Sequence, residues 1–114
     1  MYLKTTASIV AGNSQSNAIN LNQLTPVGFI TTGSTTTGSL LSFLVSSDGS
    51  NFYPLYDAAS AEVTFVVSSA SRAYAMDQYD FFGWNYLKLR EGASASSINQ
   101  ATYPATFDVI LKSF

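Results

Sequence analysis

Apolar residues recur at every second position along most of this chain, and glycine, asparagine and proline interrupt the alternation at short intervals. A period of two is typical of strands with one buried face. Helical periodicity is nearly absent, and the abundant serine and threonine favour turns and strands over helix interiors. The sequence therefore predicts an all-β fold, an antiparallel, jelly-roll-like β-sandwich of about eight short strands with little or no helix. The length fits a single domain, residues 1–114, with an extended N-terminal segment at residues 1–4.

One hairpin is clearly marked between residues 41 and 56. The two faces of its first strand alternate, with Leu41, Phe43 and Val45 on one side and Ser42, Leu44 and Ser46 on the other. Asp48 and Gly49 supply the turn, because aspartate bonds its own backbone and glycine accepts a positive φ. Pro54 in the returning strand cannot donate a ladder hydrogen bond, which predicts an edge strand or a bulge there.

The remaining strands are expected at residues 5–10, 17–21, 27–31, 62–67, 72–76, 84–90 and 106–113. In the strand at 84–90, Leu87 and Leu89 face inward, whereas Lys88 and Arg90 face water. Loops are expected at 32–39, at 77–83, where a turn of helix also fits, and at 92–104, the longest of the three. Long loops in compact domains are usually functional, so residues 92–104 form a candidate contact segment.

Several classes of activity find little support in the composition. The chain has neither histidine nor cysteine, which removes the imidazole base and the thiolate nucleophile. Five carboxylates lie beside expected turns or on solvent-facing strand positions, where no cleft would separate their pKa values: Asp48, Asp57, Glu62, Glu91 and Asp108. Asp77 and Asp80 could share a calcium ion, but a turn or cap role fits better because nothing nearby forms a calcium loop. We expect no enzymatic activity, no cofactor and no metal.

The charge pattern disfavours nucleic acid and membranes as partners. Net charge is −2, and the five basic residues are scattered rather than gathered: Lys4, Arg72, Lys88, Arg90 and Lys112. No apolar run has the roughly 18 residues needed to span a bilayer. The N-terminus turns polar at once, so no signal peptide is expected.

The aromatic residues allow two interpretations. A set comprising Tyr53, Tyr56, Phe81, Phe82, Trp84, Tyr86 and Tyr103 could form a sugar-stacking platform. Alternatively, aromatic side chains fill the core between two sheets, and the candidates are Phe52, Phe65, Phe107 and Trp84. Core packing is favoured for Trp84. Phe81 and Phe82 are successive residues that face opposite sides of an extended segment, so one of them could meet a partner.

Three blocks in the second half of the chain resemble small β-sandwich proteins of tailed-bacteriophage particles: VSSDGSNFYPLYD at 45–57, FFGWNYLKLREG at 81–92 and NQATYPATFDVILK at 99–112. The resemblance covers residues 40–112 and implies a virion structural protein. The most specific expectation is a head decoration, or cement, protein at the capsid surface. Its implied partners are the major capsid protein and copies of itself, as a trimer or dimer. A tail or fibre component, or a carbohydrate-binding module, is the alternative.

Contact with these partners is expected at the longest loop and at the segment before Trp84. The candidate residues are Tyr79, Phe81, Phe82, Ser94, Ser96, Ser97, Ile98, Asn99 and Tyr103. A neutral surface rich in serine and threonine loses little solvation when it packs against another protein. Residues 1–4 and the tail after Leu111 could add a strand to the edge of a neighbour's sheet.

Overall fold

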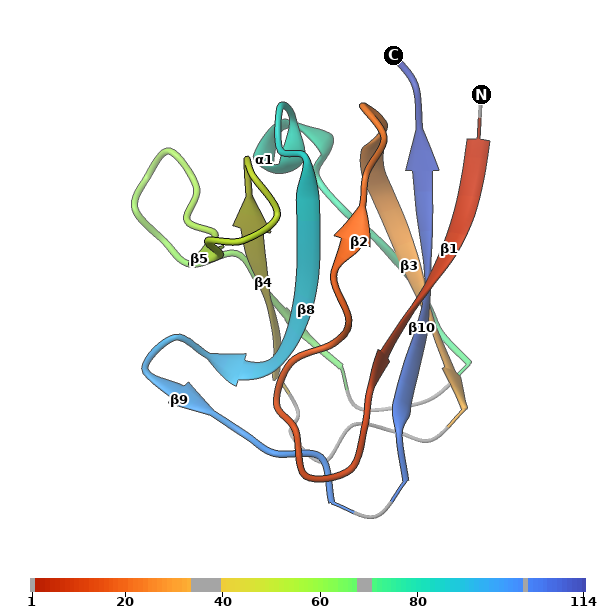
Figure 1. Ribbon diagram of the computed structural model, residues 1–114, viewed down its shortest axis with the longest axis vertical. Helices are drawn as coiled ribbons and strands as arrows, with labels where there is room; N and C mark the ends of the chain where they lie inside the picture. Colours follow the sequence, from red (N-terminus) through yellow and green to blue (C-terminus); the bar gives the residue numbers. More distant parts are fainter. Residues whose placement is uncertain (1, 34–39, 68–70, 102) are drawn as a thin grey trace.

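The computed structural model describes residues 2–33, 40–67, 71–101 and 103–114, which form a sandwich of two antiparallel sheets (Figure 1). The four-stranded sheet has the order β1 (Tyr2–Ile9), β10 (Ala105–Lys112), β3 (Thr25–Gly33) and β7 (Ala73–Ala75). The six-stranded sheet has the order β2 (Ile19–Asn20), β8 (Tyr86–Ala93), β4 (Leu40–Ser46) and β5 (Tyr53–Pro54), with β6 (Thr64–Val66) paired to β4 and β9 (Ser96–Ser97) paired to β8. A short helix, α1 (Gln78–Phe81), precedes β8. The predicted antiparallel all-β sandwich is confirmed.

The strand pairs are nested along the chain. β1 pairs with β10, β2 with β8, β3 with β7, and β4 with β5 and β6. This is one long hairpin rolled up so that successive pairs lie in alternate sheets, which is the jelly-roll topology. The first and last strands therefore lie side by side, and both termini point to one end of the molecule (Figure 1). Residues 2–4, expected as an extended segment, are the first part of β1 and pair with Lys112–Ile110 of the same chain.

The core lies between the two sheets and is rich in aromatic rings. Phe43 of β4 lies in it, with its ring centroid 6.4 Å from that of Phe29, 5.7 Å from that of Phe65 and 5.2 Å from that of Phe81. Aliphatic side chains fill the rest from both sheets: Ile9, Ile19, Leu21, Leu41, Leu87, Leu89, Val109 and Leu111. Trp84 packs against this core, as expected, whereas Phe52 does not belong to it and lies instead beneath the Lys88 ammonium.

The marked hairpin forms as predicted. Asp48 Oδ1 accepts hydrogen bonds from the backbone N–H groups of Ser50 and Asn51, both at 2.9 Å, and Gly49 adopts a φ of +83°. Pro54 lies in β5, at the edge of the six-stranded sheet, where its missing N–H breaks no ladder.

Two expectations about exposure were wrong. Arg90 was expected to face water and Glu91 to lie beside a turn or on a solvent-facing position, but both are buried. The outer face of β4, with Ser42, Leu44 and Ser46, is buried as well. Neighbouring segments cover the outer face that carries Arg90, which an alternating pattern does not reveal. Glu91 alternates with Arg90 and lies on the inner face, paired with the core residue Leu41. The expected loop at 92–104 contains the end of β8 and all of β9, and of the loop at 32–39, residues 34–39 lie outside the described part of the chain.

Candidate contact surfaces

Most of the predicted contact residues fall into two groups at opposite ends of the molecule. Tyr79 lies in α1 and Phe82 directly follows it, near the end where the termini lie. Ser96 and Ser97 form β9, which Ser94 precedes, near the other end (Figure 1). They do not form one surface. Phe81, at 1% exposure, is a core residue, and its assignment as a contact residue was wrong. The segment is a helical turn, and this turns Phe81 inward and leaves Phe82 exposed.

The β9 group forms a hairpin arm, defined here as residues 92–98. Gly92 pairs with Ser97 and Ala93 with Ser96, so Ser94 and Ala95 form the turn. Ser94, Ser96, Ser97 and Ile98 are all exposed. Gly92 is required at the base of the arm because it adopts a φ of +86°, and a Cβ there would collide with the backbone oxygen of Ser96.

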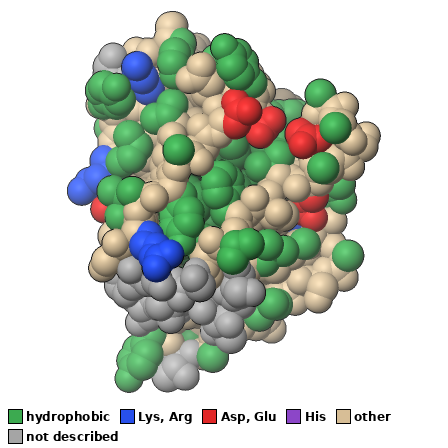
Figure 2. All heavy atoms as spheres, turned by 180° about the vertical axis from the view of Figure 1, so that it is seen from behind, with side chains coloured by type: hydrophobic (Ala, Val, Ile, Leu, Met, Phe, Trp, Pro, Cys, Tyr) green, Lys and Arg blue, Asp and Glu red, His purple; other side chains and the backbone are tan. Residues whose placement is uncertain are grey.

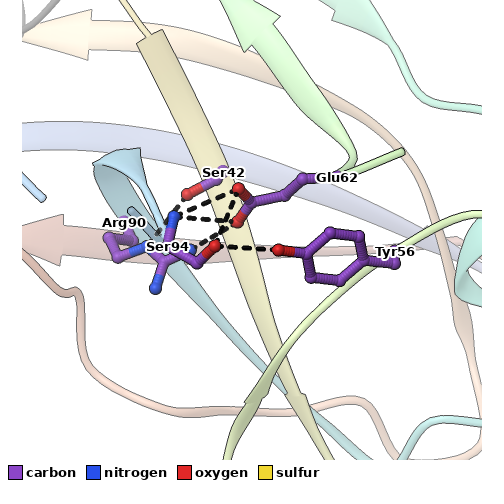
Figure 3. Close-up of polar contacts among 5 residues, drawn as sticks. All are labelled: Ser42, Tyr56, Glu62, Arg90 and Ser94. Atoms are coloured by element: carbon purple, nitrogen blue, oxygen red, sulfur yellow. Dashed lines mark hydrogen bonds and ion pairs between the residues drawn. The ribbon is translucent and has the colours of Figure 1, made fainter. Parts of the chain in front are cut away.

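A polar cluster, buried at Arg90 and Ser42 and exposed at Ser94 and Tyr56, holds the arm against the sheet (Figure 3). Arg90 donates from Nη2 to Glu62 Oε2 at 2.6 Å and from Nε to Ser42 Oγ at 3.0 Å. The other oxygen of Glu62 accepts from the backbone N–H and from the hydroxyl of Ser94, at 3.1 and 3.2 Å. Tyr56 Oη lies 2.9 Å from Ser94 Oγ. One carboxylate thus connects a buried guanidinium to the turn of the arm.

The geometry of this cluster suits a structural role, which is to hold the arm in place, rather than a chemical reaction. The Arg90 and Glu62 side chains are only 8% and 12% exposed, so the pair is largely removed from solvent. A buried ion pair fixes geometry when further hydrogen bonds engage its members; here Ser42 accepts from Arg90, and Ser94 donates to Glu62. Sequence reasoning missed the cluster because Glu62 and Arg90 lie 28 positions apart and both looked solvent-facing.

The second group belongs to a larger cluster, the terminal aromatic cluster, defined here as Tyr2, Tyr79, Phe82, Lys112 and Phe114. Ring centroids are 5.5 Å apart for Tyr79 and Phe82, and 5.7 Å apart for Phe82 and Phe114. The Lys112 ammonium lies 5.2 Å from the Phe114 ring and 5.3 Å from the Tyr2 ring. All four rings are exposed, from 42% for Phe82 to 75% for Tyr79. Contiguous exposed apolar surface of this kind is typical of interaction sites.

Three chain segments meet in this cluster. Aromatic contact residues were predicted in only one of them, whereas residues 1–4 and the tail after Leu111 were expected to add a strand to a neighbour's sheet. Tyr2 opens β1, and Lys112 and Phe114 close the chain after β10, so the pairing of the first and last strands brings them together. Tyr2 and Phe114 were not singled out because no local pattern places them beside α1.

The remaining candidates, Asn99 and Tyr103, lie outside both groups. Asn99 lines an open, polar hollow of about 410 Å³ together with Lys88 and residues 12–16. Tyr103 is 66% exposed, and its backbone oxygen accepts a hydrogen bond from Gln100 Nε2 at 2.6 Å.

The helical turn is capped by Asp77, whose Oδ1 accepts from the Tyr79 N–H at 3.0 Å, in agreement with the predicted structural role. Burial, followed by the charges of Asp77 and Asp57, raises the pKa of Asp80. Within the described part of the chain, no group of three or more acidic side chains is arranged to hold a metal ion.

The side of the sandwich that carries β6 and β7 faces away from the viewer in Figure 1. Phe65 of β6 and Tyr74 of β7 meet there across the two sheets, with centroids 6.4 Å apart. Figure 2 shows this rear face, with hydrophobic side chains gathered in a hollow and acidic side chains beside it. Among the helices of the described residues, none is long and apolar enough to cross a membrane.

Comparisons with known proteins show the fold. No protein-family model matches the chain, and no curated protein matches it significantly. Among solved structures, the crystal structure of the SPBc2 prophage-derived protein YomS is similar, with a TM-score of 0.54 and 11% identity over 97% of this chain and 94% of that one. The Yersinia pseudotuberculosis-derived mitogen is more distant, with a TM-score of 0.39 and 10% identity over 100% of this chain and 86% of that one. The likeness to YomS extends over nearly the whole of both chains and therefore concerns the complete jelly roll.

Proposed function

We propose that this chain is a non-enzymatic structural protein of a phage particle, and specifically a head decoration protein that binds the major capsid protein at the capsid surface. The observation that carries the proposal is the hairpin arm, an exposed element with small side chains that a buried ion pair holds in place. The end-to-end likeness to a prophage-derived protein supports the phage assignment. The sequence resemblance of residues 40–112 to small virion proteins points in the same direction.

The chemistry of the arm suits a protein partner better than nucleic acid or an anionic membrane. Its exposed side chains are serines, one alanine and one isoleucine, which lose little solvation or rotamer entropy when they are covered. Among the five basic residues, Arg90 is committed to the buried ion pair, and Lys4 lies 3.8 Å from Asp108. Little concentrated positive charge is left for nucleic acid or an anionic membrane. We therefore propose coat protein and further copies of this chain as the partners.

The first test is the copy number of the chain in purified particles relative to the major capsid protein. Hundreds of copies are expected for a decoration protein, a handful would assign the chain to the tail or fibre, and complete absence from particles would refute a virion role.

The second test is binding to assembled shells that lack the chain. Ile98→Asp, at the arm, should lower the affinity at least tenfold, because it buries a charge at the interface. Val66→Asp is the matched control, since Val66 is also exposed but lies on β6, which β4 separates from β8 and the arm. Equal binding by the two variants would contradict the role of the arm.

A carbohydrate-binding module is the second candidate, and the exposed rings of the terminal aromatic cluster favour it. Sugars stack on aromatic faces, and Tyr79 is three-quarters exposed. Glycan affinity that is lost in Tyr79→Ala, with the fold intact, would support this function over lattice binding. Loss on Trp84→Ala would instead show that the tryptophan stacks on ligand, although it packs against the core.

A further inference from the structure

The outer edge of β1 is the long open edge of the four-stranded sheet. β1 pairs with β10 along all eight of its residues, and none of the described strands lies on its other side. The opposite edge of the same sheet is β7, which has only three residues. An unpaired strand edge is a row of backbone donors and acceptors that another strand can complete.

Asn17 shows which backbone groups of β1 point outward. The Ser8 N–H donates to Asn17 Oδ1 at 2.8 Å, and Asn17 Nδ2 donates to the Thr6 carbonyl at 3.5 Å. In an antiparallel ladder, alternate residues direct their polar groups to opposite sides. The outward set therefore consists of the even-numbered residues, and Tyr2 and Lys4 direct their N–H and C=O groups away from β10.

The edge of β1 is thus covered along only half of its length. The Asn17 amide stands in for a neighbouring strand at Thr6 and Ser8, whereas no hydrogen bond within the described chain covers Tyr2 or Lys4 on that side. The side chains of this uncovered half are also accessible: Tyr2 is 66% exposed and Leu3 is 38% exposed.

We propose that a second copy of this chain completes this edge, with the two β1 strands antiparallel about a twofold axis at Leu3. Tyr2 of each copy then pairs with Lys4 of the other. Each of these two pairs forms two backbone hydrogen bonds, four in all, and places a lysine beside an aromatic ring. The two Leu3 side chains lie directly opposite each other and cover their exposed apolar surface. The two four-stranded sheets become one sheet of eight strands.

The neighbouring registers are less favourable. An axis at Lys4 places two ammonium groups directly opposite each other, and like charges in that position destabilise a strand pair. An axis at Thr5 requires the outward groups of Thr6 and Ser8, which Asn17 already engages. The twofold arrangement is closed, so it yields a dimer and not a fibre. Its small area makes the dimer weak and dependent on concentration.

This inference deepens the self-association that belongs to the proposed function, but the dimer forms without any capsid and is tested without one. The chain has no cysteine, so a single introduced cysteine reports one contact. Opposite residues of a non-hydrogen-bonded pair lie about 4.5 Å apart at Cα, within disulfide range. Mild oxidation should therefore convert Leu3→Cys almost completely to a covalent dimer.

Two control variants test the pairing register of the two β1 strands and measure the rate of non-specific cross-linking. Ser50→Cys, in the exposed turn between β4 and β5, should remain monomeric under the same oxidation, and Lys4→Cys should cross-link at least tenfold more slowly than Leu3→Cys. Faster cross-linking of Lys4→Cys would overturn the proposed axis. Equal rates for Leu3→Cys and Ser50→Cys would overturn the dimer.

Sedimentation velocity of the unmodified chain gives an independent measurement. The sedimentation coefficient should rise with concentration, and Lys4→Pro, which removes an outward N–H but no ladder bond to β10, should abolish the rise. Lys4→Gln removes only the charge and should retain association. A coefficient that stays monomeric at all concentrations, or an unchanged rise in Lys4→Pro, would refute the proposal. Shell binding by monomeric Lys4→Pro would leave the proposed function standing, so the two failures are distinguishable.

Discussion

Replacement of Glu62 by glutamine should destabilise the protein far more than a surface change of the same chemistry. Glu62 accepts a hydrogen bond from Arg90 on Oε2 and hydrogen bonds from Ser94 on both oxygens. Glutamine has one acceptor oxygen and one amide that can only donate. The variant therefore removes the carboxylate charge beside the buried guanidinium, and it replaces one of the two acceptor oxygens with a donor that faces either Arg90 or Ser94.

The magnitude follows from the burial of the pair. A charge-assisted hydrogen bond contributes about 1.5–3 kcal/mol, and a buried charge left without its partner costs about 3–5 kcal/mol. Glu62 is slightly accessible and water can replace part of the loss, so we expect about 2–4 kcal/mol less stability in Glu62→Gln. For a domain of this length, that lowers the Tm by roughly 10 °C.

Lys4→Gln is the matched control. This change removes the ion pair between Lys4 and Asp108. The Lys4 side chain is 64% exposed, and its Nζ lies 3.8 Å from Asp108 Oδ2. Exposed pairs of this kind contribute at most about 1 kcal/mol. The two variants change one charge each, so a difference between them reports burial and hydrogen bonding.

Chemical denaturation of Glu62→Gln, Arg90→Met and the double variant provides the assay. Because the two side chains act as a unit, the double variant should lose about 1–3 kcal/mol less than the sum of the single changes. Additive losses, together with a Glu62→Gln effect no larger than that of Lys4→Gln, would refute the reasoning.

Three further predictions concern the glycines, the aromatic pair and the response to pH. Gly92→Ala should cost about 3 kcal/mol in denaturant titrations and Gly12→Ala only about 1 kcal/mol, because both have a positive φ but only Gly92 lacks room for a Cβ. Phe81→Ala should cost about 3–5 kcal/mol and Phe82→Ala less than about 1 kcal/mol, since only the first ring is buried; equal losses would contradict this placement. Burial and nearby carboxylates raise the pKa of Asp80, so its charge opposes folding above that pKa and has no effect below the ordinary aspartate value. Asp80→Asn should therefore be more stable than the unmodified chain at neutral pH, and the gain should vanish on acidification below about pH 3 in a series of thermal melts.

The strands and the marked turn could be predicted because their signals are local. The alternation of Leu41, Phe43 and Val45, and the turn chemistry of Asp48 and Gly49, depend on residues within a few positions of one another. Alternation fixes which face a side chain occupies but not what covers that face. Arg90 does lie on the other face of β8 from Leu89, as the alternation predicts, but the hairpin arm and the segment that carries Glu62 bury it. That contact joins residues far apart in the sequence, and no local pattern encodes it.

The difference between local patterns and long-range contacts also explains what could be predicted of the terminal aromatic cluster. Phe82 was identified from its neighbour Phe81, but the assumption of an extended segment left the orientation of the two rings undecided. Asp77 caps a helical turn, which settles it. Tyr2 and Phe114 join the terminal aromatic cluster only because the first and last strands pair, the final step of the nested topology.

The anchor beneath the hairpin arm leads to a last prediction, which concerns binding rather than stability. A loose arm would lose conformational entropy when a partner orders it, at about 1–2 kcal/mol for each backbone residue fixed. The ion pair orders the turn at Ser94 before contact, so it should strengthen binding without touching the partner. At a temperature where Glu62→Gln is still folded, its affinity for shells should fall about tenfold, equivalent to about 1.4 kcal/mol, although every exposed side chain of the arm is unchanged. An affinity equal to that of the unmodified chain would show that the arm is ordered without its anchor, and that the buried ion pair serves the stability of the sheet alone.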